Sequence, residues 1–208
     1  MSGLWAHWRR AWGRRRLADA QWQCLYDAPP PGEWVALDCE TTGLDTRRDE
    51  IIAIGAVRIV GQRVLTSEAL SLRVRPQGKV PARSVRIHRL RTQDVAQGLA
   101  PEDALRQLLH FIGSRPLVGY HLAFDVAMLD RVVLPMLGVR LPQPRIEVAA
   151  LYHDWVQQRR RGLAREQPVD LRFEALLAGL DLPVWPAHDA LHDAVMAALA
   201  FIKLRQLT

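Results

Sequence analysis

The chain has 208 residues, 49% of them hydrophobic, and a net charge of +6, which suits one domain with a sizeable core plus a short appendage. No apolar run approaches the ~20 residues of a membrane-spanning helix, and the N-terminus lacks the apolar core of a secretion signal. Two cysteines, Cys24 and Cys39, make no disulfide framework. We therefore expect a cytoplasmic protein without membrane contact. The positive charge favours a polyanionic partner, although an arginine-rich coding composition would produce the same charge.

An N-terminal segment, residues 3–27, carries Trp5, Trp8 and Trp12 at helical spacing, interleaved with arginines: Arg9, Arg10, Arg14, Arg15 and Arg16. This pattern predicts an amphipathic helix. Its tryptophan face either docks on the domain or contacts a protein partner or nucleic acid, with a membrane surface the least favoured reading. The proline run at 29–31 indicates a stiff linker. We therefore predict a helical extension and linker over residues 1–30 and the main domain over residues 31–208.

The apolar run at 34–37 predicts a buried strand that ends in two carboxylates, Asp38 and Glu40. Side chains two apart on a strand point to the same face, so the two acids project together while Cys39 points the other way. The Thr-Thr-Gly that follows predicts a turn. Adjacent carboxylates repel each other and favour a hard cation such as Mg²⁺ or Mn²⁺ between them. Taken alone, the pair would be explained better by a solvated strand end.

Two more strands are predicted at 49–60 and 63–75, joined by a hairpin at 60–63. Residues 71–93 contain no acid and seven basic residues: Arg73, Arg75, Lys79, Arg83, Arg86, Arg89 and Arg91. This stretch is either a solvated loop or a contact for substrate phosphates.

The rest of the chain predicts a helix at 101–113, a strand at 117, a helix at 125–138 that bends or ends near Pro135, a short strand at 145–151, and helices at 169–179 and 189–204. Asp189 reads as the N-cap of the last helix. A hairpin-linked trio of strands followed by strand–helix units predicts an α/β fold with a mixed sheet flanked by helices.

Asp38, Glu40, Asp125 and Asp193, with His188, stand in this order on three strand or helix ends. The Asp-x-Glu-Thr-Thr-Gly segment together with His-x4-Asp resembles the DEDDh 3′→5′ exonucleases, a family that includes polymerase proofreading subunits, ribonuclease T and oligoribonuclease. The resemblance runs from about residue 34 to the C-terminus. It implies a ribonuclease-H-like, five-stranded sheet of order 3-2-1-4-5 with strand 2 antiparallel.

The resemblance also implies two Mg²⁺ or Mn²⁺ ions held by the four acids, with Asp38 shared between them, and His188 as the general base. It implies that Glu40 and Thr41 contact the terminal 3′-hydroxyl and that Leu44 wedges between the last two bases.

The segment 87–90 resembles a His-Gly-Ile segment of the family's substrate cleft, so His88 is carried over as a substrate contact, although Arg89 replaces the glycine. A further departure is His121, where the family commonly has Asn. We expect activity to survive this change because histidine can also donate a hydrogen bond.

We expect a metal-dependent exonuclease that releases 5′-mononucleotides from single-stranded or frayed DNA ends, in proofreading or repair. The alternatives are an RNA-trimming exoribonuclease of the same family and a catalytically silent nucleic-acid-binding module. The sequence runs only just past the last predicted helix. It therefore favours a stand-alone enzyme, or one that meets a protein partner through its N-terminal helix, over the replicative subunit.

Overall fold

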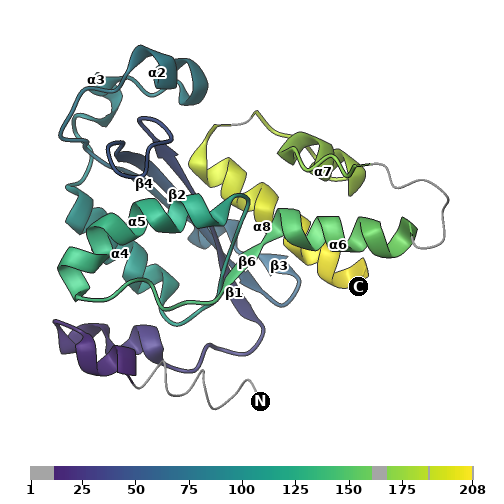
Figure 1. Ribbon diagram of the computed structural model, residues 1–208, viewed down its shortest axis with the longest axis horizontal. Helices are drawn as coiled ribbons and strands as arrows, with labels where there is room; N and C mark the ends of the chain where they lie inside the picture. The colour runs from purple at the N-terminus through teal and green to yellow at the C-terminus, as the bar shows by residue number, and fades with distance from the viewer. Residues whose placement is uncertain (1–11, 161–167, 187, 208) are drawn as a thin grey trace.

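The computed structural model describes residues 12–160, 168–186 and 188–207. A mixed β-sheet runs through the molecule with helices on both of its faces (Figure 1). Its strands are β1 (Glu33–Thr41), β2 (Ile51–Val60), β3 (Arg63–Val64), β4 (Leu70–Arg73), β5 (Leu117–Gly119) and β6 (Arg145–Glu147). The helices are η1 (Ala20–Tyr26), η2 (Thr66–Glu68), α2 (Ala82–His88), α3 (Thr92–Val95), α4 (Pro101–Ile112), α5 (Leu122–Leu137), α6 (Val148–Arg160), α7 (Phe173–Gly179) and α8 (Ala190–Leu207). None of the described helices has the length and hydropathy needed to cross a bilayer.

The strand order is β3-β2-β1-β5-β6, with β4 also paired to β2. The β1–β2 pair is antiparallel, whereas β5 is parallel to both β1 and β6. The predicted α/β class and the order 3-2-1-4-5 with an antiparallel second strand are therefore confirmed.

The single strand predicted at 63–75 is wrong, because η2 divides it into β3 and β4. Val64 pairs with Ile59 and Leu70 pairs with Ala56. Between these two pairs the segment has five residues, 65–69, whereas β2 has two, 57–58, and the excess is taken up by the 3₁₀ turn.

The core lies on both faces of the sheet. Val35 and Leu37 of β1 pack with α4 and α5, whereas Ala36 packs with α6, α7 and α8. Helix α8 lies against both β1 and β2 and is buried along most of its length. The prediction that this apolar helix occupies the centre of the fold is confirmed.

Four predictions along the chain need correction. Helix α5 begins at Leu122, before the predicted start at Asp125, and ends at Leu137, close to the predicted end at residue 138. Only Arg145–Glu147 of the predicted strand 145–151 pairs with β5, and the chain then enters α6. The basic stretch 71–93 forms the end of β4, α2 and the start of α3 in place of an open loop. Helix α7 also begins at Phe173, later than the predicted residue 169.

The described part of the N-terminal segment contains a helical stretch at 12–16 and then η1. Trp12 is exposed, with the Arg16 guanidinium 4.4 Å from its ring centre. Trp22 and Leu25 are buried in the same cluster as Val35. Trp5, Trp8, Arg9 and Arg10 lie outside the described residues. The boundary at residue 30 stays a prediction, although side chains on both sides of it share one core.

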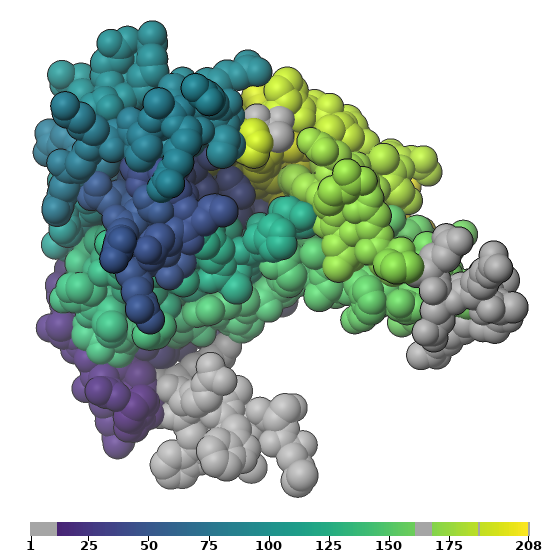
Figure 2. Space-filling view, turned by 45° about the horizontal axis from the view of Figure 1, so that its top comes forward, coloured from purple at the N-terminus to yellow at the C-terminus, as the bar shows by residue number. Residues whose placement is uncertain are grey.

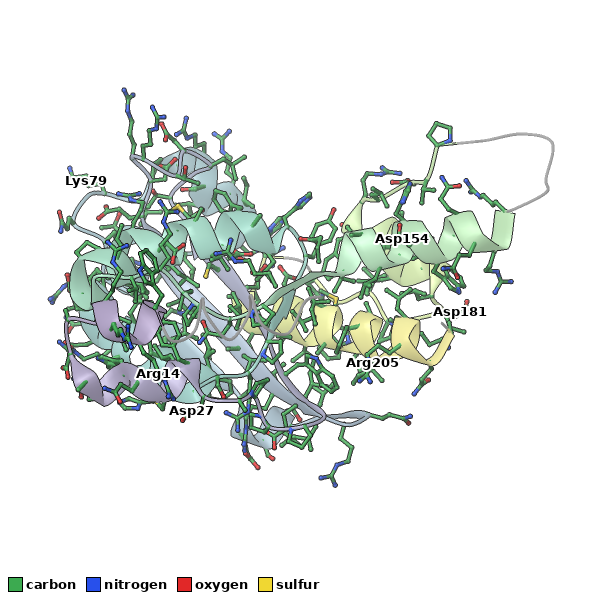
Figure 3. The ribbon with its side chains drawn as sticks, turned by 60° about the horizontal axis from the view of Figure 1, so that its bottom comes forward. Arg14, Asp27, Lys79, Asp154, Asp181 and Arg205 are labelled. Atoms are coloured by element: carbon green, nitrogen blue, oxygen red, sulfur yellow. The ribbon has the colours of Figure 1, made fainter. Side chains whose placement is uncertain are left out.

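Figure 3 shows Arg14 and Asp27 close together at the surface of this N-terminal segment. Their side chains form an ion pair that links the helical stretch at 12–16 to the residue that follows η1. A backbone hydrogen bond of 2.9 Å from the Ala18 N–H to the Leu137 carbonyl ties the segment to the end of α5.

Candidate active site

The two acids of β1 lie on the face of the sheet that α8 covers. Ala36, two residues before Asp38, packs with α8, and Cys39 belongs to the opposite cluster with α4 and α5. The alternation predicted for this strand is therefore observed. It directs Asp38 and Glu40 toward the beginning of α8.

A glycine in β2 brings α8 to these acids. Gly55 is the cross-strand partner of Asp38, and a Cβ atom built on Gly55 would lie 2.2 Å from the backbone of Ala190 and Leu191. Only a residue without a side chain allows the first turn of α8 to rest directly on the sheet. Our sequence reasoning missed Gly55, although an isolated glycine in a strand rich in isoleucine and valine is a signal for close backbone approach.

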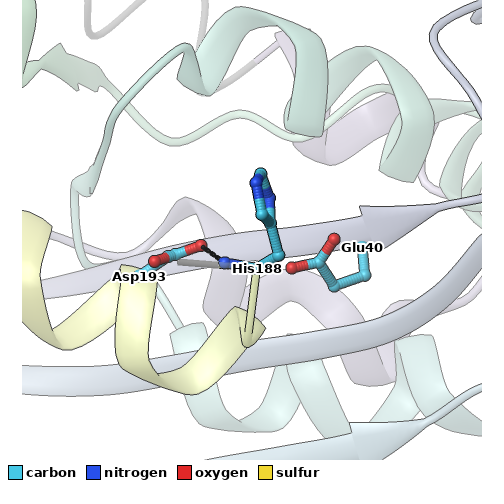
Figure 4. Close-up of side chains that lie close together, drawn as sticks. All are labelled: Glu40, His188 and Asp193. Atoms are coloured by element: carbon cyan, nitrogen blue, oxygen red, sulfur yellow. Dashed lines mark hydrogen bonds between the residues drawn. The ribbon is translucent and has the colours of Figure 1, made fainter. Parts of the chain in front are cut away.

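Glu40, His188 and Asp193 meet across this contact, with ligand atoms within 4.8 Å of one another (Figure 4). The His188 N–H donates a 3.0 Å hydrogen bond to Asp193 Oδ2, and His188 adopts a left-handed backbone with φ 70°. Asp189 accepts hydrogen bonds from the N–H groups of Leu191 and His192, which confirms it as the N-cap of α8. A short capped turn thus presents an imidazole and a carboxylate to the end of β1.

Asp193 Oδ1 is buried and has no hydrogen-bond partner among the described residues. A buried carboxylate oxygen without a donor is costly unless a cation occupies the space beside it. Oxygen ligands of this kind suit Mg²⁺ or Mn²⁺. The residues present therefore fit a divalent cation at this position.

Asp125 approaches β1 from the other side. Strand β5 pairs with β1 at Val35 and Ala36, so at Cys39 this edge of β1 is not paired to β5. The Cys39 N–H on that edge donates a 3.2 Å hydrogen bond to Asp125 Oδ1. This bond fixes the buried Asp125 side chain beside Asp38 and Glu40.

Glu147, at the end of β6, is a positioning residue that our sequence reasoning did not find. Its carboxylate accepts hydrogen bonds from the N–H groups of His121 (3.1 Å) and Leu122 (2.9 Å), and so caps the first turn of α5. The Ala149 N–H, at 3.2 Å, donates to the same carboxylate. This cap explains why α5 begins earlier than predicted. It also sets the position of Asp125 in the first turn.

His121, which replaces the expected asparagine, has a left-handed backbone with φ 55°. Asparagine and histidine are among the non-glycine residues that tolerate this conformation best. The His121 ring lies 4.3 Å from the Tyr120 ring and makes no capping hydrogen bond. The backbone geometry is thus one that both residue types accept, and the side chain points into solvent.

Burial and mutual repulsion raise the pKa of every acid in the cluster. Burial raises the pKa of Asp38 well above its usual value, and the charges of Asp125, Asp193 and Glu40 raise it further. Burial is the main cause for Asp125, whose pKa is about 8, and for Glu40, whose pKa is about 7. Burial raises the pKa of Asp193, and the hydrogen bond from the His188 N–H lowers it by a smaller amount. Carboxylates with raised pKa values of this kind are poised to exchange protons for a cation.

Of the three predicted substrate contacts, Thr41 ends β1, Leu44 follows it by three residues, and His88 ends α2. The Thr41 hydroxyl donates a 2.7 Å hydrogen bond to the Gly43 carbonyl, in the turn that follows β1. Leu44 is 84% exposed on that turn. His88 is buried at the end of α2, its Nδ1 accepts the Leu90 N–H at 3.0 Å, and its Nε2 has no partner among the described residues. Burial and the neighbouring His188 lower the pKa of His88, which places it near that residue.

Figure 2 shows the α2–α3 segment and the beginning of α8 on the same side of the molecule. Arg83, Arg86 and Arg89 are exposed on or directly after α2. Arg89 caps α2 in a left-handed conformation with φ 61°, which explains physically why a glycine is common at this position. The basic stretch therefore borders the site through a short helix.

Comparison with known proteins agrees with this geometry. The chain matches the Exonuclease family (RNase_T) over residues 35–201. It is 32% identical to a DNA polymerase III subunit epsilon-like protein of Rhodobacter capsulatus, covering 82% of this chain and 23% of that protein. It is 24% identical to the DNA polymerase III subunit epsilon of Aquifex aeolicus, covering 83% of this chain and 80% of that one. The chain spans less than a quarter of the length of the first relatives that it matches.

Two solved structures share the fold. The zinc-bound E. coli ExoI–ssDNA complex superposes with a TM-score of 0.68 at 18% identity, covering 85% of this chain and 41% of that one. Exonuclease X in complex with 5′-overhanging duplex DNA superposes with a TM-score of 0.63 at 24% identity, covering 83% of this chain and 91% of that one. Because the family match covers most of the chain and includes every acid of the cluster, the protein belongs to the exonuclease family.

Proposed function

We propose that this chain is a DEDDh-type, two-metal-dependent 3′→5′ exonuclease that releases 5′-mononucleotides from single-stranded or frayed DNA ends. One observation carries the proposal. Acids from three distant segments converge at the end of β1, and one of them, Asp193, has a buried oxygen for which the described residues offer no hydrogen-bond donor. The exonuclease family match supplies the reaction class.

Asp38, Glu40, Asp125 and Asp193 are the residues that would hold Mg²⁺ or Mn²⁺. When bound, such ions neutralise phosphate charge and make water a stronger acid. In our proposal Asp38 would be shared between two ions, Glu40 and Asp193 would complete one site, and Asp125 would support the other. The raised pKa values of these carboxylates support the assignment, since a cation would relieve their repulsion.

His188 is proposed as the general base that accepts a proton from the attacking water. Its backbone N–H is bound to Asp193, whereas its side chain is exposed. The loop is therefore held at its backbone while the imidazole remains free to face the substrate. The distance of at most 4.8 Å between its ligand atom and those of Glu40 and Asp193 puts it within reach of the reaction.

Most of the proposed substrate contacts lie at the end of β1 and in the turn that follows it. Glu40 and Thr41 would contact the terminal 3′-hydroxyl, Leu44 would separate the last two bases, and His88 would line the cleft. The exposure of Leu44 supports its role, because a wedge must be free to enter a base stack. Two structural relatives are complexes with single-stranded DNA or overhanging duplex DNA, which favours DNA as substrate.

The test uses 5′-labelled DNA and RNA oligonucleotides of one sequence, single-stranded and duplex, with Mg²⁺, with Mn²⁺ or with chelator. We expect a ladder that shortens from the 3′ end on single-stranded DNA, slower loss of blunt duplex, and no reaction with chelator. The Asp38→Asn variant is the matched inactive control. Internal cuts would overturn the exonuclease assignment. A ladder on RNA alone would establish the exoribonuclease alternative, and binding without hydrolysis would establish the silent module.

A further inference from the structure

The register of the sheet places one arginine in line with Glu40. Glu40 is paired with Ala53 on β2, and Ala53 is paired with Arg73 on β4. Residues directly opposite each other in a sheet project their side chains from the same face. The side chains of Glu40 and Arg73 therefore leave the sheet on the face that α8 covers, with only the methyl group of Ala53 between them.

The neighbouring row has the same arrangement. Asp38 is paired with Gly55, and Gly55 with Ser71 of β4. Small residues on β2 thus separate the acids of β1 from β4 in both rows. The first turn of α8 fills the space above Gly55, whereas the Glu40 row carries Arg73 at its far end. On this face of the sheet, β1 and β4 are therefore separated by positions of β2 that carry small side chains or none.

Arg73 is exposed, and its side chain forms no hydrogen bond or ion pair with the residues that the structure describes. It is nevertheless close enough for its charge to act on Glu40, His88 and Asp94. This distinguishes it from Arg91, which is bound to Asp94 through its guanidinium. An uncommitted guanidinium beside a carboxylate cluster is available for an anion that enters the same site.

A guanidinium presents a planar fork of N–H donors that matches the oxygens of a phosphate group. We propose that Arg73 binds a phosphate oxygen of the nucleic acid at the Glu40 end of the site, an inference that rests on the proposed exonuclease function. The phosphate is either an internal phosphodiester or a terminal 3′-phosphate, since both offer the same oxygens. Arg73 thereby has a role separate from the exposed arginines of α2.

The experiment compares Arg73→Gln, Arg73→Lys and a matched control, Arg63→Gln. Arg63 is also exposed and paired to β2, but it lies opposite Val60, seven residues along β2 from the partner of Arg73, or roughly 23 Å at the usual rise of a strand. Steady-state kcat and KM are measured on oligonucleotides that end in a 3′-hydroxyl or a 3′-phosphate, with metal titrations and melting temperatures for each variant.

We expect Arg73→Gln to lower kcat/KM about 10- to 100-fold, the effect of losing a hydrogen bond to a charged group. The loss should appear mainly in KM, with an unchanged melting temperature. Arg73→Lys should recover part of the loss, because it retains the charge but not the fork. Arg63→Gln should change kcat/KM by no more than about twofold, because exposed charges at that distance are screened. A loss equal on both oligonucleotides identifies a phosphodiester contact, and a larger loss on the 3′-phosphate identifies a terminal contact.

Equal values for Arg73→Gln and Arg63→Gln on both substrates would overturn the inference. A weakened metal affinity with unchanged KM at saturating metal would also overturn it, because Arg73 would then act only on the charge of Glu40. A wild-type protein that degrades neither substrate would instead disprove the proposed function, so the two failures are distinguishable.

Discussion

The two sides of β1 hold their parts of the site in different ways. On the α5 side, Asp125 is fixed by the Cys39 N–H, and its helix is capped by Glu147. On the α8 side, the contact depends on the absence of a side chain at Gly55. There, Asp193 Oδ1 has no hydrogen-bond partner within the described parts of the chain, and His188 is exposed. The α5 half is thus a completed hydrogen-bonded structure, whereas the α8 half contains the groups still open to a cation, water or substrate.

This difference indicates a division of labour. Burial and satisfied donors make the α5 half rigid before any ligand binds. The α8 half keeps a left-handed, exposed histidine next to an unsatisfied acceptor, an arrangement typical of reacting groups. Substitutions in the α8 half should therefore affect chemistry most, and substitutions in the α5 half should affect stability and positioning.

The largest effect should come from Asp38, which both halves share. We expect Asp38→Asn to reduce hydrolysis below detection while the fold is retained, because an amide is a poor substitute for a carboxylate ligand. Asp154→Asn, on the exposed side of α6, is the control with the same charge change and should retain full activity. Metal-titrated nuclease assays and circular dichroism measure the outcome. Turnover at the wild-type level in Asp38→Asn would show that the acid cluster is not the catalytic site.

His188→Ala tests the reactive group of the α8 half. We expect kcat to fall roughly 10²- to 10⁴-fold, the usual contribution of a general base, with little change in metal affinity. His153→Ala, on α6, provides a histidine control away from the cluster. Isothermal titration with Mn²⁺ and single-turnover kinetics separate the two quantities. If His188→Ala loses metal affinity but keeps its kcat at saturating metal, His188 acts as a metal ligand and not as a general base.

Gly55→Ala tests the packing that holds the α8 half. The new methyl group would overlap the backbone at Ala190, so α8 must move or the sheet must bend. We expect a loss of about 1–3 kcal/mol in the free energy of unfolding, together with a large loss of kcat/KM. Gly78→Ala is the control, because its Cβ would meet only Glu50, at 3.4 Å. Wild-type activity in Gly55→Ala would show that the register of α8 on β2 is not needed for catalysis.

Glu147→Gln tests the α5 half. The carboxylate now accepts hydrogen bonds from two N–H groups, and the amide would point its NH₂ donor at one of them. We expect the free energy of unfolding to fall by about 1–3 kcal/mol. We expect a lower melting temperature and only a several-fold loss of kcat, because the Cys39 N–H still holds Asp125. Urea denaturation and steady-state kinetics measure the two effects. A loss of kcat as large as that of His188→Ala would contradict the division between the two halves.

The smallest effect should be the pH dependence of stability without metal. The pKa values of Glu40, about 7, and Asp125, about 8, lie above their usual values of 4.5 and 3.8. The folded state therefore binds protons that the unfolded state has released. This contribution to stability is present at acidic pH and is lost as pH rises through 7 and 8.

Melting temperatures with chelator should accordingly fall between pH 5.5 and 8.5, and Mn²⁺ should raise the melting temperature more at pH 8.5. Asp38→Asn should reduce the fall, because it removes one of the repelling charges. A melting temperature of the metal-free protein that rises over this range would contradict the raised pKa values.

The sequence alone determined the α/β fold class, and its resemblance to a known family added the strand order and the set of five site residues. Local patterns account for two parts of this: the alternation that directs Asp38 and Glu40 to one face, and the acids that follow a strand or begin a helix. The capping role of Asp189 was also predictable, since its partners lie within three residues.

The tertiary structure decided what joins these residues. Glu147 acts on an N–H group 25 residues away, and Asp125 on one 86 residues away. Gly55 matters only because α8 crosses it, and Arg73 only because the register of two strand pairs aligns it with Glu40. Such contacts leave no periodic signal in the chain, because the backbone groups and register positions that make them are set by how distant segments pack.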